Sequence, residues 1–266
     1  MAKARGRCVL AVDVGNTVTR FGLFDAASGS DELELLGSCE LTTLAPVTAD
    51  EARVRLGQAL ALLPDVEPAG AILSCVVPSV TDAWRRACAA AVPSRALVVG
   101  PGLRTGLRMR YDDPGEVGPD RVADVVAARH RYGAPVVVVD LGTTTNLEVI
   151  DADGAFAGGV IAPGMALGAH ALAEAAARLP EVELRAPAGV IGRNTRAAMQ
   201  SGVVLGEAAR IDGLLDGVAA ELGCAPTVVL TGDDAAGVAC LIAHDAEVDD
   251  TLTLRGLALL WAANAR

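Results

Sequence analysis

Aromatic side chains are scarce in this chain: Phe, Trp and Tyr together make up only 3% of its 266 residues. Apolar residues nevertheless account for 52% of the sequence. A core must therefore be built mainly from Ala, Val and Leu, with elements that approach one another closely. The length allows one large domain or two domains of ordinary size.

Positive charge is also in short supply. The chain has 22 Lys and Arg against 33 Asp and Glu, which gives a formal net charge of −11. Nucleic-acid binding relies on clusters of basic residues that neutralise phosphates, so this balance argues against a nucleic-acid partner. An anionic substrate would have to be received by local Arg residues or by a metal ion, because the overall field repels it.

Long hydrophobic runs and paired cysteines are missing as well. No stretch approaches the roughly 18 apolar residues that a membrane-spanning helix needs. Residues 1–7 are basic, but Asp13 interrupts the apolar run that follows, so we expect no signal peptide. The six cysteines show no C-x-x-C spacing and are typical of a reducing compartment. We therefore expect a soluble, cytoplasmic protein without a membrane partner.

The chain lacks the G-x-x-x-x-G-K-[ST] loop of P-loop nucleotide-binding proteins, but a different phosphate-binding pattern lies near its start. The apolar run 8–12 leads into Asp13 and Gly15, and the apolar pattern resumes at 21–24. This predicts a buried strand, a tight turn and the second strand of a hairpin. An ordinary hairpin with a polar turn is the alternative.

The residue types in this turn suit phosphate chemistry. Asp13 at a strand end can hold a hydrated Mg²⁺ ion. Gly15 lets the backbone approach a ligand closely. An anion-binding surface can be formed by the N–H groups and hydroxyls of the polar residues that follow, which are Asn16, Thr17 and Thr19.

The same design recurs about half the chain length later. An apolar run 136–139 leads into Asp140, Gly142 and Thr143. The simplest explanation is an internal duplication of a domain-sized unit. Two such turns facing each other across a cleft could grip one nucleoside triphosphate from both sides, which resembles the actin-like ATPase and sugar-kinase fold.

Strand-like and helix-like segments alternate along the chain and predict an α/β protein. Strands are expected at 8–12, leading into Asp13, at 21–24, 32–41, 69–77 and 96–99, at 136–139, leading into Asp140, and at 146–150, 155–161 and 227–230. Helices are expected at 50–63, capped by Thr48, at 80–91, capped by Ser79, and at 119–132, 163–179, 196–221 and 252–263.

A polar segment rich in Gly and Pro interrupts this alternation at 108–121. Pro119 is suited to the first turn of a helix, which places Asp120 and Arg121 beside the positive end of its dipole. The alternative is a domain linker with an Asp at a helix start.

In their order and spacing these stretches resemble the type III pantothenate kinases over nearly the whole chain. Each motif alone is weak; the seven that carry the resemblance are 13–17, 110–114, 118–121, 140–143, 158–164, 191–195 and 231–232. The resemblance implies an α/β fold with two actin-like (ribonuclease-H-like) domains related by internal duplication, 1–118 and 119–266, and a nucleotide cleft between them. It also implies a homodimer and ATP-dependent phosphorylation of pantothenate, the first step of coenzyme A biosynthesis.

The resemblance further implies a role for individual residues. ATP with its Mg²⁺ would be held by Asp13, Val14, Gly15, Asn16, Thr17, Val18, Thr19, Arg20 and Thr143. Pantothenate would be held by Tyr111, Gly118, Pro119, Asp120, Arg121 and Thr195. Asp120 would accept the hydroxyl proton, and Asp140 would bind an activating monovalent cation, K⁺ or NH₄⁺. Because this proton leaves late in a loose transition state, Asp120 can keep a near-normal pKa. Arg121 could pair with the pantothenate carboxylate and would also keep Asp120 ionised.

Three positions depart from the usual pattern of that family. Val18 stands where Asn is common, Glu148 stands where Asp is common, and Asp233 replaces the second Gly of a Thr-Gly-Gly motif near the nucleotide base. None of these departures removes a residue that is assigned to the chemistry. His170 lies in the helix where some members carry a His near pantothenate, which leaves a substrate contact open.

Two other functions have to be weighed. A non-catalytic regulator on the same scaffold is disfavoured because Asp13, Asp120 and Asp140 are all retained. Another small-molecule kinase of the actin-like superfamily is disfavoured because the chain lacks the Cys cluster of zinc-containing sugar kinases and carries the 110–114 motif.

Overall fold

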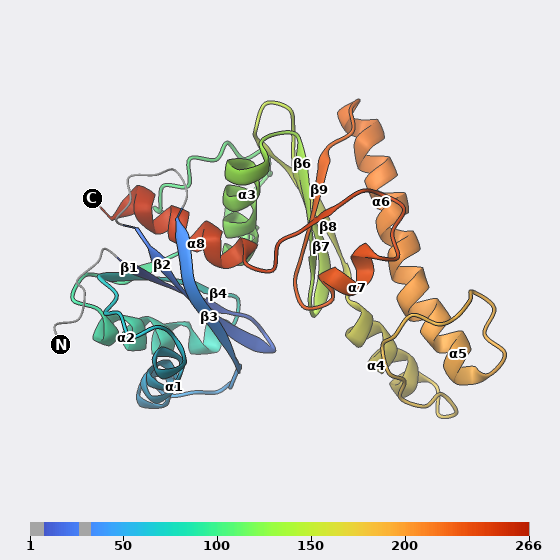
Figure 1. Cartoon of the computed structure of the whole chain (residues 1–266), viewed down its shortest axis with the longest axis horizontal. Coiled ribbons are helices and arrows are strands. Elements are labelled where there is room, and N and C mark those ends of the chain that lie inside the picture. The colour runs from blue at the N-terminus through green and yellow to red at the C-terminus, as the bar shows by residue number, and fades with distance from the viewer. Residues whose placement is uncertain (1–7, 27–32, 266) are drawn as a thin grey trace. The chain divides into compact units, whose positions relative to one another are not determined.

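The computed structural model describes residues 8–26 and 33–265 (Figure 1). The chain forms two compact units: unit 1 is Met1–Leu107, Asp112–His130 and Thr251–Arg266, and unit 2 is Arg108–Tyr111 and Arg131–Asp250. This division differs from the expected boundary after residue 118, because 119–130 and the C-terminal segment group with unit 1. The expected domain limits and the cleft between them stay predictions.

Unit 1 is built on a five-stranded sheet with the order β3-β2-β1-β4-β5. The antiparallel strands are β1 (Cys8–Val14), β2 (Val18–Asp25) and β3 (Glu34–Thr42), and the strands parallel to β1 are β4 (Gly70–Cys75) and β5 (Leu97–Val98). Every residue of β1 is buried. This central position explains why β1 reads as a nearly continuous apolar run.

Four α-helices accompany this sheet: α1 (Ala49–Leu62), α2 (Thr81–Ala91), α3 (Pro119–Tyr132) and α8 (Leu252–Asn264). The expected Thr48 cap is confirmed, because Thr48 and Glu51 form a capping box. The expected Ser79 cap is wrong, because a 3₁₀ turn, Pro78–Val80, precedes α2 and no side chain caps it. Pro119 opens α3 as expected.

Unit 2 repeats the design of unit 1. Its sheet has the order β10-β9-β6-β7-β8, from β6 (Val136–Leu141), β7 (Thr144–Ile150), β8 (Phe156–Pro163), β9 (Thr227–Thr231) and β10 (Glu247–Val248). β6, β7 and β8 are antiparallel neighbours, while β9 and β10 run parallel to β6. The strand order and the pairing directions match those of unit 1, which supports the expected duplication.

The helices of unit 2 differ in detail from the expectation. They are α4 (Met165–Ala175), α5 (Thr195–Gln200), α6 (Gly206–Leu222) and the short α7 (Ala235–Ala239). Helix α4 ends before the expected Leu179. The single helix expected at 196–221 is instead α5 and α6 joined by a π-helical turn, Ser201–Leu205.

The structure also bears on two further expectations, which concern membrane-spanning helices and cysteines. None of the helices in the described part of the chain is long and apolar enough to cross a membrane. All six cysteines lie in the described residues and carry free thiols, and Cys8 and Cys88 are buried. The basic segment 1–7 lies outside the described residues. The same holds for residue 32, the first residue of the strand expected at 32–41.

Candidate active site

The first predicted phosphate-binding turn joins β1 to β2 in unit 1. The Gly15 N–H donates to the Val18 carbonyl oxygen at 3.0 Å. A Cβ at position 15 would stand 2.9 Å from that same oxygen, so the turn closes this tightly only around a glycine. Asn16 and Thr17 are exposed at the tip of the turn, where a ligand can reach them.

Thr19 is placed differently from its neighbours. Its side chain is buried, and its hydroxyl shares a 2.8 Å hydrogen bond with Thr43 Oγ1. The Thr43 N–H in turn donates to the Thr17 carbonyl oxygen at 2.9 Å. The Thr19 hydroxyl therefore braces the turn from behind, and its expected contact with ATP stays a prediction.

Asp13 lies at the end of β1 and is only 6% exposed. It pairs in register with Arg20 on β2 and with Ser74 on β4. Burial, followed by the charge of Asp120, raises the pKa of Asp13 to about 6, while the Ser74 hydroxyl and the Arg20 charge act in the opposite direction. Its buried Oδ1 has no hydrogen-bond partner in the described part of the chain. Such a carboxylate oxygen suits a hydrated Mg²⁺ ion.

Asp120 lies in the first turn of α3. Its Oδ1 accepts a hydrogen bond from the Arg121 N–H at 2.8 Å, and a Cβ at Gly118 would come within 2.5 Å of the same oxygen. The near-normal pKa expected from the sequence is wrong. Burial raises the pKa of Asp120, although the backbone N–H and the charge of Arg121 oppose the shift.

The fold of unit 1 brings Asp13 and Asp120 together from distant parts of the sequence. The negative charge of Asp120 contributes to the raised pKa of Asp13. Unit 1 thus places two carboxylates close to each other beside the first turn.

The second predicted turn joins β6 to β7 in unit 2 and is one residue shorter than the first. The Gly142 N–H donates to the Thr144 carbonyl oxygen at 3.0 Å, which leaves Thr143 exposed at the tip. Gly164 supports the turn, because its N–H donates to the Thr143 carbonyl oxygen at 3.1 Å. A Cβ at position 164 would come within 2.2 Å of the Gly142 carbonyl oxygen, so only glycine fits there.

Asp140 lies at the end of β6, in register with Asn146 on β7 and Thr231 on β9. Gly232 follows β9 with a φ of 93°. A Cβ at Gly232 would stand 2.8 Å from Asp140 Oδ1 and 2.4 Å from the Leu141 carbonyl oxygen. A carboxylate oxygen and a carbonyl oxygen therefore face nearly the same point, and an all-oxygen donor set of this kind suits K⁺.

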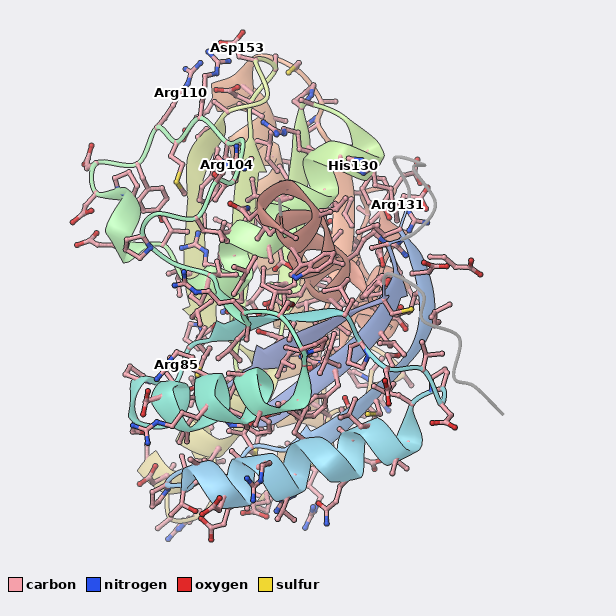
Figure 2. The ribbon with its side chains drawn as sticks, turned by 90° about the vertical axis from the view of Figure 1, so that its left-hand side faces the viewer. Arg85, Arg104, Arg110, His130, Arg131 and Asp153 are labelled. Carbon is pink, nitrogen blue, oxygen red and sulfur yellow. The ribbon has the colours of Figure 1, made fainter. Side chains whose placement is uncertain are left out.

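Tyr111 belongs to a short segment, 108–111, that lies along the edge of β8 in unit 2. The Arg110 N–H donates to the Phe156 carbonyl oxygen, and the Phe156 N–H donates to the Arg108 carbonyl oxygen, both at 2.8 Å. Arg110 also pairs with Asp151 at 3.0 Å and with Asp153 at 2.7 Å (Figure 2). The Tyr111 ring stacks on Phe156 with 5.4 Å between the ring centroids.

Thr195 and His170 are both exposed in unit 2. Thr195 is the first residue of α5, after the Asn194 cap that accepts the Ala197 N–H at 2.9 Å. His170 lies 4.0 Å from Glu174 on the same helix, and its substrate contact stays open.

The three departures from the family pattern fall in different surroundings. Val18 begins β2 and takes part in the first turn through its carbonyl oxygen. Glu148 is fully buried on β7. Asp233 lies beside Asp234, whose pKa is raised by burial and then by the charges of Asp233 and Glu207.

The sequence analysis missed an ion pair on α6, between the buried Glu207 and the partly exposed Arg210. The signal available in the sequence was weak: an acidic residue in a helix, with a basic residue three positions later. Whether such a pair is buried depends on the sheet against which the helix packs.

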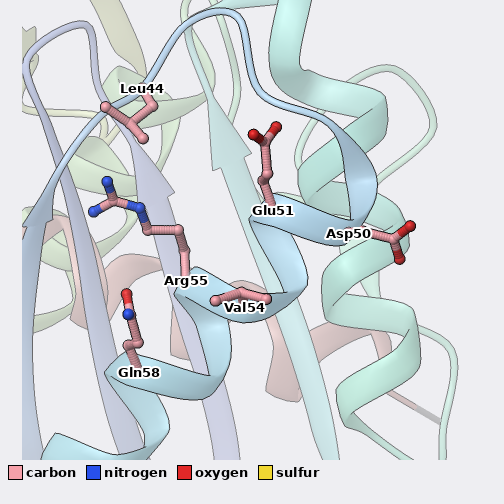
Figure 3. Close-up of a pocket in the computed structure, with 6 residues that line it drawn as sticks. All are labelled: Leu44, Asp50, Glu51, Val54, Arg55 and Gln58. Carbon is pink, nitrogen blue, oxygen red and sulfur yellow. The ribbon is translucent and has the colours of Figure 1, made fainter.

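A surface hollow of unit 1 contains none of the predicted site residues (Figure 3). It is lined by Leu44 and by the first turns of α1, with Asp50, Glu51, Val54, Arg55 and Gln58. Glu51 already accepts hydrogen bonds from Thr48 as part of the capping box, so its charge serves the start of the helix.

Comparison with known proteins gives a consistent result. The family model described as type III pantothenate kinase matches residues 9–217. A type III pantothenate kinase of Brevibacillus brevis is 38% identical over 262 residues, which covers 96% of this chain and 99% of the relative. One of Roseiflexus is 42% identical over 263 residues, with the same coverage.

Solved structures support the fold. A Campylobacter jejuni protein described as a Baf family transcriptional activator has a TM-score of 0.57 at 19% identity, covering 96% of this chain and 98% of its own. The ethanolamine utilization protein EutJ of Carboxydothermus hydrogenoformans has a TM-score of 0.56 at 14% identity, covering 95% and 90%. At these identities the likeness shows the fold alone, and it confirms the two-domain actin-like architecture.

Proposed function

The chain belongs to the type III pantothenate kinase family, and from this premise we propose that it transfers the γ-phosphoryl group of ATP to the primary hydroxyl of pantothenate. This reaction is the first step of coenzyme A biosynthesis. The observation that carries the proposal is the similarity to pantothenate kinases over 96% of the chain at 38–42% identity. The regulatory alternative is not favoured, since the transcriptional activator resembles this chain in fold only.

Unit 1 supplies the residues closest to the proton transfer. We assign Asp120 as the acceptor of the hydroxyl proton, because it lies beside Asp13 and the first turn of α3 holds its carboxylate in place. Asp13 would hold the Mg²⁺ of ATP with its orphaned Oδ1. Bound Mg²⁺ neutralises charge on the phosphate oxygens during transfer. Arg121 suits the pantothenate carboxylate as a bidentate donor.

The remaining residues of the first turn would bind ATP mainly through the backbone. The tight turn is formed by Val14, Gly15 and Asn16, and Thr17 is exposed next to them. Successive N–H groups in a turn form an anion-binding surface without any basic side chain. Such a surface is useful here, because the chain carries a strong negative charge overall.

Unit 2 supplies further contacts. Thr143 would contact ATP from the exposed tip of the second turn, and Asp140 with the Leu141 carbonyl would bind K⁺ or NH₄⁺. Tyr111, held against Phe156, and Thr195 would contact pantothenate. Gly118 and Pro119 would do so from unit 1, at the start of α3.

We also propose a homodimer that works in the cytoplasm without a nucleic-acid or membrane partner. Exposed apolar side chains lie on β8, on α4 and in the segment before α5, namely Ile161, Leu167, Leu172, Val190 and Ile191. Apolar residues of this size in contact with water favour association with another copy. Six free thiols agree with a reducing compartment.

A coupled ATP assay tests this function directly. The purified chain, with Mg²⁺ and K⁺, is given pantothenate or one of a panel of sugars. We expect ATP consumption with pantothenate alone, and a much lower rate when Na⁺ replaces K⁺. No consumption with pantothenate would overturn the kinase assignment, whereas equal rates in Na⁺ would overturn only the cation role of Asp140.

A further inference from the structure

A buried carboxylate on α6 ties two strands of unit 2 to one helix. Glu207 is only 4% exposed, and the Thr145 hydroxyl donates to its Oε1 at 2.5 Å. Its other oxygen pairs with Arg210, one turn further along α6. Arg210 also donates to the Pro163 carbonyl oxygen at 2.7 Å. The pair therefore reaches β7 through Thr145 and β8 through Pro163.

Both contacts fall on the chain segments that flank the second phosphate-binding turn. Thr145 lies two residues after Thr143, at the start of β7. Pro163 is the last residue of β8 and directly precedes Gly164, whose N–H donates to the Thr143 carbonyl oxygen. One ion pair thus fixes the turn from the strand that leaves it and from the strand end that supports it.

A role in positioning the neighbouring turn explains this ion pair better than a contribution to the stability of the fold. Burying a carboxylate costs free energy unless it is paired and hydrogen-bonded, and well-packed apolar residues often stabilise a helix–sheet contact equally well. What an ion pair adds is direction: it fixes where the Thr145 hydroxyl and the Pro163 carbonyl lie. A π-helical turn, Ser201–Leu205, directly precedes α6, and such turns are frequent at functional sites.

We propose that Glu207 and Arg210 are positioning residues for phosphoryl transfer, which hold the turn 142–144, and with it Thr143, in the geometry that receives the phosphates of ATP. This inference rests on the proposed kinase function. Neither residue touches the reacting atoms; both act through the turn. A small displacement of a group that positions substrate can cost up to about 100-fold in rate, so such a brace matters for catalysis.

The test compares Glu207→Gln and Thr145→Val with the conservative Thr145→Ser. We expect the first two to raise the KM for ATP about tenfold, the loss expected from one hydrogen bond to a buried charge, with the pantothenate KM changed less than about twofold. Thr145→Ser retains the hydroxyl and should restore the wild-type KM. The double variant should raise the KM by less than the product of the two single effects, because the substitutions weaken one connected network. Glu221→Gln, an exposed position on the same helix, is the matched control.

Hydrogen exchange of the unliganded protein gives a readout that does not depend on activity. In Glu207→Gln and Thr145→Val, amides of 140–147 should exchange faster than in the wild type, while those of 13–18 stay unchanged. A wild-type protein inactive on pantothenate would overturn the function but not this result. An unchanged ATP KM, unchanged exchange at 140–147, or a lowered melting temperature as the sole effect would each overturn the positioning role.

Discussion

At the scale of single residues, Asp13 shows how a binding group can work against the stability of the fold. Its carboxylate is buried, and its Oδ1 has no hydrogen-bond partner in the described part of the chain. Burial penalises the ionised form, and the neighbouring Asp120 charge adds to that penalty. A cation at this position would remove both costs. The folded protein therefore holds the ionised Asp13 at a cost in free energy, and a metal ion bound to ATP would offset that cost.

Because the ionised Asp13 is unfavourable in the folded state, we predict that Asp13→Asn stabilises the fold to an extent that depends on pH. The pKa is raised from 3.8 to about 6 on folding, so the folded state favours the protonated carboxyl. The stabilising contribution of that protonated form is complete below about pH 3.8 and is lost as the pH rises through about 6. At pH 8 the ionised group costs roughly 3 kcal/mol, from about 1.4 kcal/mol per pKa unit.

We therefore expect the Asn variant to melt higher than the wild type at pH 8, without Mg²⁺ or ATP, and to lose this advantage at pH 4. Its use of Mg·ATP should weaken at the same time. Thermal melts across this pH range measure the first effect, and the KM for ATP measures the second. An advantage of equal size at both pH values would contradict the electrostatic explanation.

Asp120→Asn should separate proton transfer from nucleotide binding. Removing a positioned general base costs about 10²–10⁴-fold in rate, which corresponds to roughly 3–5 kcal/mol. We expect kcat to fall in that range with little change in the KM for ATP, the pattern of an interaction used mainly in the transition state. Glu116→Gln, an exposed carboxylate of the preceding 3₁₀ turn, is the control. Retention of more than about a tenth of kcat would leave Asp120 as a residue of the helix start only.

At the scale of elements, the sequence predicted best where local chemistry decides. β1 and β6 were predicted because central strands read as apolar runs, and α3 was predicted because Pro119 suits a helix start. The π-helical turn Ser201–Leu205 was not predicted, because it leaves the helical spacing of apolar residues almost unchanged. β10 is only two residues long, and its pairing with β9 defines it.

The edge segment 108–111 supports a prediction about pantothenate binding. Arg110 is 54% exposed and pairs with the buried Asp151 and the exposed Asp153, and an ion pair at the surface is worth only about 0.2–1 kcal/mol. Arg110→Gln should therefore raise the pantothenate KM modestly, by about two- to fivefold, because Tyr111 is held less firmly on Phe156. The KM for ATP should not change. Arg85→Gln, which removes an exposed pair on α2, should change neither constant (Figure 2).

The contact between α8 and α3 in unit 1 gives a stability prediction. A Cβ at Gly256 would lie within 1.9 Å of the Ala123 carbonyl oxygen, a backbone atom that cannot move aside alone. Gly256→Ala should destabilise the fold by about 1–3 kcal/mol, the usual cost of overpacking. It should also lower kcat, because α3 carries Asp120.

A matched glycine on α6 provides the control. A Cβ at Gly213 would meet nothing within 4 Å, so Gly213→Ala should stabilise the helix by up to about 1 kcal/mol. Urea unfolding of both variants measures the difference. Equal effects from the two substitutions would mean that the close approach of α8 to α3 does not prevent a larger side chain at position 256.

At the scale of the whole molecule, the duplication was readable from sequence because both copies keep the strand, Asp, Gly and Thr order. The proximity of Asp13 and Asp120 was not, because it depends on where α3 lies against the sheet of unit 1. The grouping of 251–266 with unit 1 was missed for a similar reason. Gly22 and Gly70 leave room for side chains of α8, and Gly256 on α8 allows its close approach to α3. These contacts form only in the folded chain, so the sequence pattern does not reveal them.

The last prediction concerns association. The net charge of −11 makes two copies repel each other, so a dimer must be held by apolar contacts. Ile161, Leu167 and Leu172 are 63%, 43% and 42% exposed on β8 and α4. Light scattering at micromolar concentration should give twice the mass of one chain, and added salt should not dissociate the dimer, because screening weakens the repulsion.

Substitutions to Glu then locate the interface. Leu167→Glu and Leu172→Glu each bury a charge in the dimer, so both should yield monomers that keep the wild-type melting behaviour of each unit. Val54→Glu makes the same change at a position that is 62% exposed on α1 of unit 1, and it should remain a dimer. A monomeric wild type would rule out the dimer. Dissociation by Val54→Glu alone would move the interface to α1, because only a buried position makes an added carboxylate costly.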